Sequence, residues 1–152
     1  MVLSAIVNTS HSSSQPTRIF KNKWFARFAQ RQNIEDQQLC DAVARAQRDL
    51  IDADLGGRVI KQRIPRPNEG RSGGYRSILL FQNAGHIFFV YGFAKNERDN
   101  ISQDELDGFR ALAEIFLAFD DQKLQIALSK ETLTEVKCDA QNLQEQCLGR
   151  HS

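Results

Sequence analysis

The sequence predicts an α+β domain. Apolar residues recur at helical spacing up to about residue 53 and again after residue 102. Between residues 58 and 94 they follow strand patterns instead, either alternating or continuous. The links between these strands are too short for crossover helices, so we expect antiparallel pairing. We also expect the helices to cover one side of the resulting sheet.

The N-terminal third predicts a short strand and two helices. Residues 18–20 read as the strand, and a helix follows from Lys21 and ends at Asn33. A second helix is expected from about Glu35 to Ala53, with glycines 56 and 57 after its end. Each helix carries an apolar stripe that we expect to lie in the core: Trp24, Phe25 and Phe28 in the first, and Leu39, Val43, Ala46 and Leu50 in the second.

The central segment predicts three strands. Residues 58–64 alternate, so Lys61 and Arg63 should project from one face of the first strand. Prolines and glycines mark 65–74 as a loop. Residues 75–82 and 86–94 are apolar on both faces and are separated by a turn at 83–85. The strand at 86–94 is therefore expected to lie centrally in the sheet.

Two further helices are expected after the strands. Ser102 and Glu105 have the spacing of a capping box at the start of an amphipathic helix that places Phe109 and Phe116 in the core. Asp120 could cap the last helix. The chain therefore reads as one domain over residues 17–136, with flexible segments at 1–16 and 137–152.

Several function classes find no support in the sequence. Cysteines and histidines are few and widely spaced, which predicts reduced thiols, no disulfide framework, no metal site and no cofactor. These residues are Cys40, Cys138, Cys147, His11, His86 and His151. No apolar stretch approaches the ~20 residues that cross a bilayer, and no basic region precedes the apolar start as in a secretory signal. We expect a cytoplasmic protein without a membrane partner.

Positive charge gathers in residues 58–77, although the whole chain has a net charge of only +1. This segment holds one acid, Glu69, and six basic residues: Arg58, Lys61, Arg63, Arg66, Arg71 and Arg76. A solvated loop is one interpretation, and a patch that binds a polyanion is the other. If the strands at 58–64 and 75–82 form a hairpin, Arg76 should lie within reach of Arg63 and Arg66. Lys95 and Arg98 follow the third strand.

A cationic site with few histidines suits RNA cleavage. RNA supplies its own nucleophile, the 2′-hydroxyl, so a protein has to orient it, stabilise charge on the phosphate and move two protons. Arginine can clamp phosphate oxygens, and a lysine among other cations is a candidate base. No Ser-His-Asp set or paired carboxylates suggest another hydrolytic chemistry.

Three motifs carry a resemblance to a known family. "IKQRI", "GGYRSILLF" and "FFVYGFAKNERDNIS", followed by an amphipathic helix, resemble the RelE/HigB-like toxins of bacterial type II toxin–antitoxin modules over residues 18–118. The resemblance implies two N-terminal helices on a curved antiparallel sheet. It also implies a ribosome-dependent endoribonuclease that cuts mRNA and is neutralised by an antitoxin. On that basis Lys61, Arg63, Arg76 and Lys95 are the catalytic candidates, and Arg58, Arg66, Arg71 and Arg98 are the RNA-binding candidates.

Two positions depart from the family pattern. Asn96 stands where well-known members carry an arginine, and Ser102 stands where they carry a base-stacking tyrosine. Tyr75, Tyr91 or Phe93 could supply the stacking surface instead. Two alternatives therefore stay open: a ParE-like inhibitor of DNA gyrase, and a non-catalytic RNA- or ribosome-binding domain.

Overall fold

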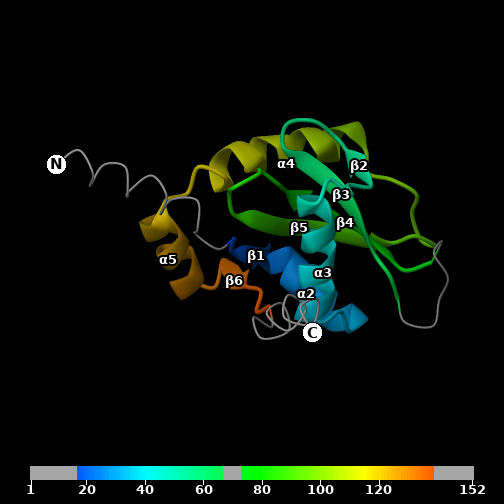
Figure 1. Ribbon diagram of the computed structural model, residues 1–152, viewed down its shortest axis with the longest axis horizontal. Helices are drawn as coiled ribbons and strands as arrows, with labels where there is room; N and C mark the ends of the chain where they lie inside the picture. Colours follow the sequence, from blue (N-terminus) through cyan, green and yellow to red (C-terminus); the bar gives the residue numbers. More distant parts are fainter. Residues whose placement is uncertain (1–16, 67–72, 139–152) are drawn as a thin grey trace, which may run out of the picture.

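The computed structural model describes residues 17–66 and 73–138, and within these ranges the chain forms four helices and six strands (Figure 1). The elements in chain order are β1 (Ile19–Asn22), α2 (Lys23–Gln32), α3 (Asp36–Gln47), β2 (Ala53–Asp54), β3 (Val59–Ile64), β4 (Tyr75–Leu80), β5 (Ile87–Ala94), α4 (Gln103–Phe116), α5 (Asp121–Ser129) and β6 (Leu133–Glu135). The predicted α+β class is confirmed.

The strands form one sheet in the order β2-β3-β4-β5-β1-β6. β3, β4 and β5 pair antiparallel, and β5 lies between β4 and β1, so both predictions for this region are confirmed. The sheet as a whole is mixed, because β1 runs parallel to β5. β2 and β6 have two and three residues and were not predicted, since such short strands carry no readable period.

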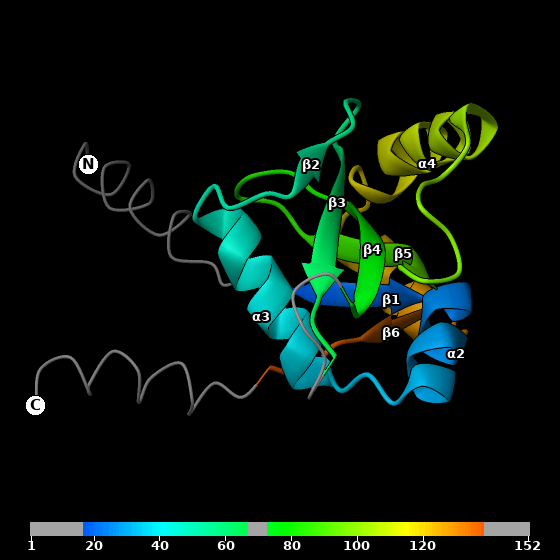
Figure 2. The same cartoon turned by 90° about the vertical axis from the view of Figure 1, so that its right-hand side faces the viewer.

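Helices lie on both faces of the sheet, so the expectation of one-sided cover was wrong. Figure 2 shows α3 and α4 on opposite sides of the strands. In β5, Ile87 and Phe89 belong to a core shared with α2 and α3, whereas Phe88 and Val90 belong to a core shared with α4 and α5. A strand that is apolar on both faces needs cover on both.

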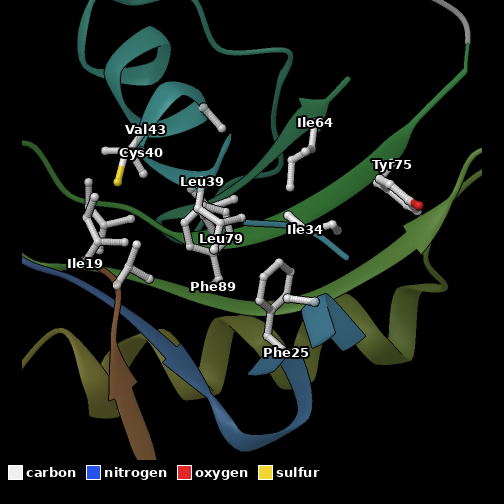
Figure 3. Close-up of a cluster of buried hydrophobic side chains, with 14 of the residues drawn as sticks. Ile19, Phe25, Ile34, Leu39, Cys40, Val43, Ile64, Tyr75, Leu79 and Phe89 are labelled. Atoms are coloured by element: carbon white, nitrogen blue, oxygen red, sulfur yellow. The ribbon is translucent and has the colours of Figure 1, made fainter. Parts of the chain in front are cut away.

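The core beneath α2 and α3 is built largely from aliphatic and aromatic side chains (Figure 3). Phe25 and Phe28 of α2 are buried there, as predicted. Gly92 of β5 allows α2 to approach closely, because a Cβ at this position would lie 2.6 Å from Cε2 of Phe28. Trp24, by contrast, is 40% exposed, so its assignment to the core was wrong.

The helix ends follow local capping chemistry. Asn33 ends α2, as predicted, and its backbone adopts the left-handed conformation. α3 ends at Gln47, six residues earlier than expected, because Asp49 turns left-handed and the Leu50 N–H donates back to the Arg45 carbonyl. Leu50 is therefore exposed and does not extend the apolar stripe.

Glycines 56 and 57 lie between β2 and β3, both with positive φ, instead of following a helix. The caps of the later helices are confirmed. Ser102 and Glu105 form the predicted capping box of α4, and the Asp120 side chain accepts from the Lys123 N–H at the start of α5.

A disulfide joins Cys40 of α3 to Cys138, which follows β6. The expectation that these thiols are reduced is therefore wrong for this pair. The two residues are 98 positions apart, and only the tertiary fold brings their Cα atoms to 5.8 Å. The backbone N–H of Lys137 also donates to Asp36 at 2.8 Å, so the chain after β6 is attached to α3 at two adjacent residues.

Flexible segments were expected at residues 1–16 and 137–152. Of these residues, the structure describes only 137 and 138, so the expectation lies almost entirely outside the described part of the chain. Arg71 and Cys147 also lie outside them. Among the helices of residues 17–66 and 73–138, none is long and apolar enough to cross a membrane.

Candidate nucleic-acid interface

Three of the predicted site residues lie on the same face of the sheet. Val59 of β3 packs in the core next to α4, so the alternation of the strand directs Lys61 and Arg63 to that face as well. Arg76 of β4 is the cross-strand partner of Arg63. All three cationic side chains are partly exposed. The predicted proximity of Arg63 and Arg76 is confirmed.

Arg76 lacks a carboxylate partner within residues 17–66 and 73–138. Its Nη1 donates only long hydrogen bonds, of 3.5 Å to the Gly73 carbonyl and 3.4 Å to the Tyr75 carbonyl. Burial and then the nearby Arg63 charge lower the pKa of Arg76 from its ordinary value, and Asp52 opposes this. A guanidinium with this environment is suited to receive an anion.

A β-bulge places two aromatic residues beside these cations. The β4–β5 register shifts between Ile78, which pairs with Tyr91, and Leu79, which pairs with Phe89. Val90 is the extra residue. Strict alternation from Phe89 would put Tyr91 on the face of α2 and α3, but Tyr91 packs with the core on the α4 side.

Arg98 lies against the two aromatic rings. Its guanidinium carbon is 5.7 Å from the ring centres of both Tyr91 and Phe93, and its Nη1 donates to the Tyr91 hydroxyl at 2.6 Å. Glu105 of α4 forms an ion pair with the same guanidinium. We call the surface formed by Lys61, Arg63, Arg76 and Arg98 the basic face.

The Arg98–Glu105 pair shifts the titration of both groups. The Arg98 hydrogen bonds, followed by the backbone N–H of Ser102, lower the pKa of Glu105 to about 2. The same carboxylate raises the pKa of Arg98. Nearby, Lys61 Nζ donates to Asn100 Oδ1 at 3.4 Å, so the segment before α4 reaches the lysine of β3.

Lys95 lies at the border of the basic face. Its backbone N–H donates to the Gly74 carbonyl at 3.1 Å, which places it beside the start of β4. Its ammonium group pairs with Asp99 at 3.2 Å, and Asn96 next to it is exposed. Lys95 is thus close to Arg76 in the sheet but has its own counter-ion.

Two other predicted RNA-binding residues are not brought to the basic face. Arg58 is five residues before Arg63, about 16 Å along the strand, and lines a hollow with Ile60 and Phe81 of the opposite face. Arg66 packs its guanidinium over the Tyr75 ring at 4.6 Å, also on the side of α2 and α3. The expectation that Arg76 reaches Arg66 was therefore wrong. The last candidate, Arg71, lies outside the described residues.

Tyr75 and Ser102 do not provide a stacking surface at the basic face. The Tyr75 hydroxyl donates to Gln32 of α2 at 3.1 Å, on the opposite side of the sheet. The Ser102 hydroxyl accepts from the Glu105 N–H as a helix cap. Sequence reasoning missed Trp24, whose ring centre is 4.5 Å from that of Tyr91. Helical spacing does not distinguish Trp24 from a core residue, because it precedes the buried Phe25 by one position and the buried Phe28 by four.

The arrangement can bind the phosphate groups of an extended polyanion. Lys61, Arg63 and Arg76 offer several N–H donors within one strand pairing, and the adjacent rings offer flat apolar surfaces. In the part of the chain that the structure describes, no group of three or more His, Cys, Asp or Glu side chains is arranged to hold a metal ion.

The fold and the basic face define a small α+β domain whose sheet presents cations and aromatic rings to an anionic ligand. The family model described as the RelE toxin of the RelE/RelB toxin–antitoxin system matches residues 17–136. The chain therefore belongs to the RelE toxin family, and the resemblance seen in its motifs is confirmed. It is the toxin of a toxin–antitoxin system, which implies an antitoxin partner. No curated protein matches the chain.

Proposed function

We propose that this toxin is a ribosome-dependent endoribonuclease that cleaves mRNA in the cytoplasm. The observation that carries the proposal is the gathering of Lys61, Arg63 and Arg76 on one sheet face, where Arg76 has no carboxylate partner among the described residues. Membership of a family whose toxins generally cleave mRNA supports it.

The proposed reaction uses the RNA as its own nucleophile. The 2′-oxygen attacks the adjacent phosphorus, and the bond from phosphorus to the 5′-oxygen breaks, which leaves a cyclic phosphate and a 5′-hydroxyl. Arg76 and Arg63 bind the non-bridging oxygens, where charge develops in the transition state. Lys61 accepts the proton of the 2′-hydroxyl or contacts the phosphate, and the departing 5′-oxygen takes up a proton from water. Lys95 contributes charge at the border of the site.

Primer extension on mRNA from cells that express the toxin tests the proposal. We expect discrete new 5′ ends within translated messages, and we expect Arg76→Ala to lower cleavage by about 100-fold or more, as loss of an oxyanion-stabilising donor does. Arg58→Ala is the matched control, because it removes the same charge from the opposite end and face of β3. Intact messages in cells whose translation is arrested would contradict the proposal.

A second candidate is a non-catalytic ribosome- or RNA-binding toxin. It is favoured by Ser102, because this residue replaces the family's stacking tyrosine and its hydroxyl serves as a helix cap. In that case Lys61→Ala and Arg76→Ala would weaken binding, with no cleavage to lose. A ParE-like gyrase inhibitor would instead induce the DNA damage response in the same cells, without early arrest of translation.

We further propose that the antitoxin carries an acidic segment that covers the basic face. The positive charge there would be neutralised by such a partner. Co-purification with the antitoxin should weaken for Arg63→Glu and Arg76→Glu and stay unchanged for Arg58→Glu. If the antitoxin co-purifies equally well with the parent toxin and all three variants, it binds a surface other than the basic face.

A further inference from the structure

Trp24 is a large aromatic residue that the fold leaves exposed. It lies in the first turn of α2, and 40% of its surface is accessible, whereas Phe25 and Phe28 of the same helix are buried. It is also the single tryptophan of the chain. The Trp24 ring stacks on Phe28 with an interplanar angle of 17°, which fixes it on the helix.

The position of Trp24 follows from where β1 ends. β1 pairs with β5 only as far as Lys21, opposite Phe89. The chain then turns into α2, and the Asn22 side chain donates to the Val90 carbonyl. Trp24 therefore lies along the edge of β5 beyond its pairing with β1, and its ring is tilted by 30° against Tyr91.

This arrangement extends the basic face by an aromatic surface. Tyr91, Ile78 and Lys61 are successive partners across β5, β4 and β3, so about 10 Å separates the backbones of Tyr91 and Lys61. Arg98 lies over Tyr91, and its positive charge faces the aromatic ring. Cations on one side and an exposed aromatic ring on the other match the two chemical parts of a nucleotide strand, its phosphates and its bases.

We propose that Trp24, supported by Tyr91, is a base-stacking site for single-stranded RNA held at the basic face. The inference rests on the proposed function only in that RNA is the ligand; it does not require cleavage. Exposure favours this role over a structural one, because Trp24 keeps a large open surface beside cations. An aromatic stack is tolerant of base identity, so the site should position RNA more than it selects sequence.

The fluorescence of Trp24 gives a direct test in the full-length toxin. The probe is a 2′-O-methyl oligoribonucleotide, which lacks the nucleophilic hydroxyl and cannot be cleaved by the proposed route. Its control is an abasic strand of equal length and charge. We expect quenching of the fluorescence by the first strand and little quenching by the second. Equal responses to both strands, or no binding of either at low salt, would overturn the proposal.

Substitutions separate stacking from charge. Trp24→Ala should weaken binding of the 2′-O-methyl strand by about 5- to 150-fold without changing its salt dependence. Trp24→Phe should retain most of the affinity. Arg76→Ala should instead reduce the slope of log affinity against log salt by about one. If Trp24→Ala does not fold, two measurements still test the stacking site. They are the affinity of Trp24→Phe relative to the parent, and the difference in Trp24 quenching between the 2′-O-methyl strand and the abasic strand.

The outcomes also distinguish this inference from the proposed function. Base-dependent quenching without mRNA cleavage in cells would support the stacking site and contradict the nuclease. Cleavage with an RNA affinity that Trp24→Ala leaves unchanged would overturn the stacking site alone. If Trp24→Ala weakens capture of the antitoxin and not of RNA, Trp24 belongs to a protein interface and the stacking site is refuted.

Discussion

Arg63 of β3 and Arg76 of β4 are direct cross-strand partners on the same face of the sheet. In such a pair the Cβ atoms lie about 5 Å apart, and like charges at that distance destabilise the sheet. The burial of Arg76 adds to this cost, as the lowered pKa of its guanidinium indicates. The sheet therefore retains a charge arrangement that its own stability does not favour, which is typical of a binding site.

Replacement of Arg76 by methionine should raise the stability of the toxin while it removes function. The free energy of unfolding is expected to increase by up to about 1 kcal/mol, because the repulsion from Arg63 is lost and an apolar side chain of similar length remains. Urea denaturation measures the change. Arg58→Met, at an exposed position away from the pair, should leave stability within about 0.5 kcal/mol. A clear loss of stability in Arg76→Met would show that the two arginines do not repel.

Addition of one methyl group at Gly92 should destabilise the fold. The new Cβ would lie 2.6 Å from Cε2 of Phe28 and 3.2 Å from Cε1 of Phe25, both buried rings of α2. We expect Gly92→Ala to lower the free energy of unfolding by about 1–3 kcal/mol. Gly108→Ala is the matched control, because nothing lies within 4 Å of a Cβ there. In the middle of α4 it should raise stability by about 1 kcal/mol.

The ion pair between Glu105 and Arg98 should make stability depend on acid pH. The pKa of Glu105 is lowered in the folded state, from 4.5 to about 2. Its contribution is therefore present above about pH 4.5 and is lost as the pH falls towards 2. Glu105→Gln keeps an acceptor for the Ser102 N–H and removes the charge. The variant should be less stable than the parent at pH 7, and the two should converge near pH 2.

Urea midpoints at pH 7, 4 and 2.5 measure this convergence. Glu114 is exposed on the same helix and forms no ion pair among the described residues. Glu114→Gln should therefore change stability by less than about 0.5 kcal/mol at neutral pH. A difference between Glu105→Gln and the parent that stays constant down to pH 2 would argue against the ion pair.

Reduction of the Cys40–Cys138 disulfide should destabilise the toxin. The bond closes a segment of 98 residues, and loss of such a cross-link costs up to about 4.7 kcal/mol in the chain-entropy model. Mass spectrometry after alkylation identifies the bond, and thermal unfolding with and without reductant measures its effect. Cys40→Ser should unfold at the same temperature in both conditions. If the toxin acts in the cytoplasm, as proposed, the reduced form is the relevant one, because cytoplasmic thiols are usually kept reduced.

Much of the fold could be predicted from local sequence. The alternation around Lys61 and Arg63 fixed their common face, and the caps at Ser102 and Asp120 were readable because capping involves residues three positions apart. Strand β5 was correctly placed at the centre from its apolar character on both faces. The same observation also implies helices on both sides, which the prediction of one-sided cover overlooked.

Features that depend on the tertiary fold could not be predicted. The partner of Arg98 is Glu105, and no spacing rule links a loop cation to the third residue of the next helix. The opposite placement of Arg66 depends on its contact with Tyr75 after the chain leaves β3. The exposure of Trp24 depends on the residue at which β1 stops pairing with β5. Each of these features is a contact between separate elements, and such contacts produce no periodic pattern in the sequence.

The bulge at Val90 makes the chemistry of this surface sensitive to the register of β5. If β5 paired regularly with β4 through Val90, Tyr91 and Phe93 would turn away from the arginines, although every functional side chain would still be present. Relatives of this toxin that keep every residue of the strand but lack the bulge can therefore share all of its motifs and still present a different surface to RNA.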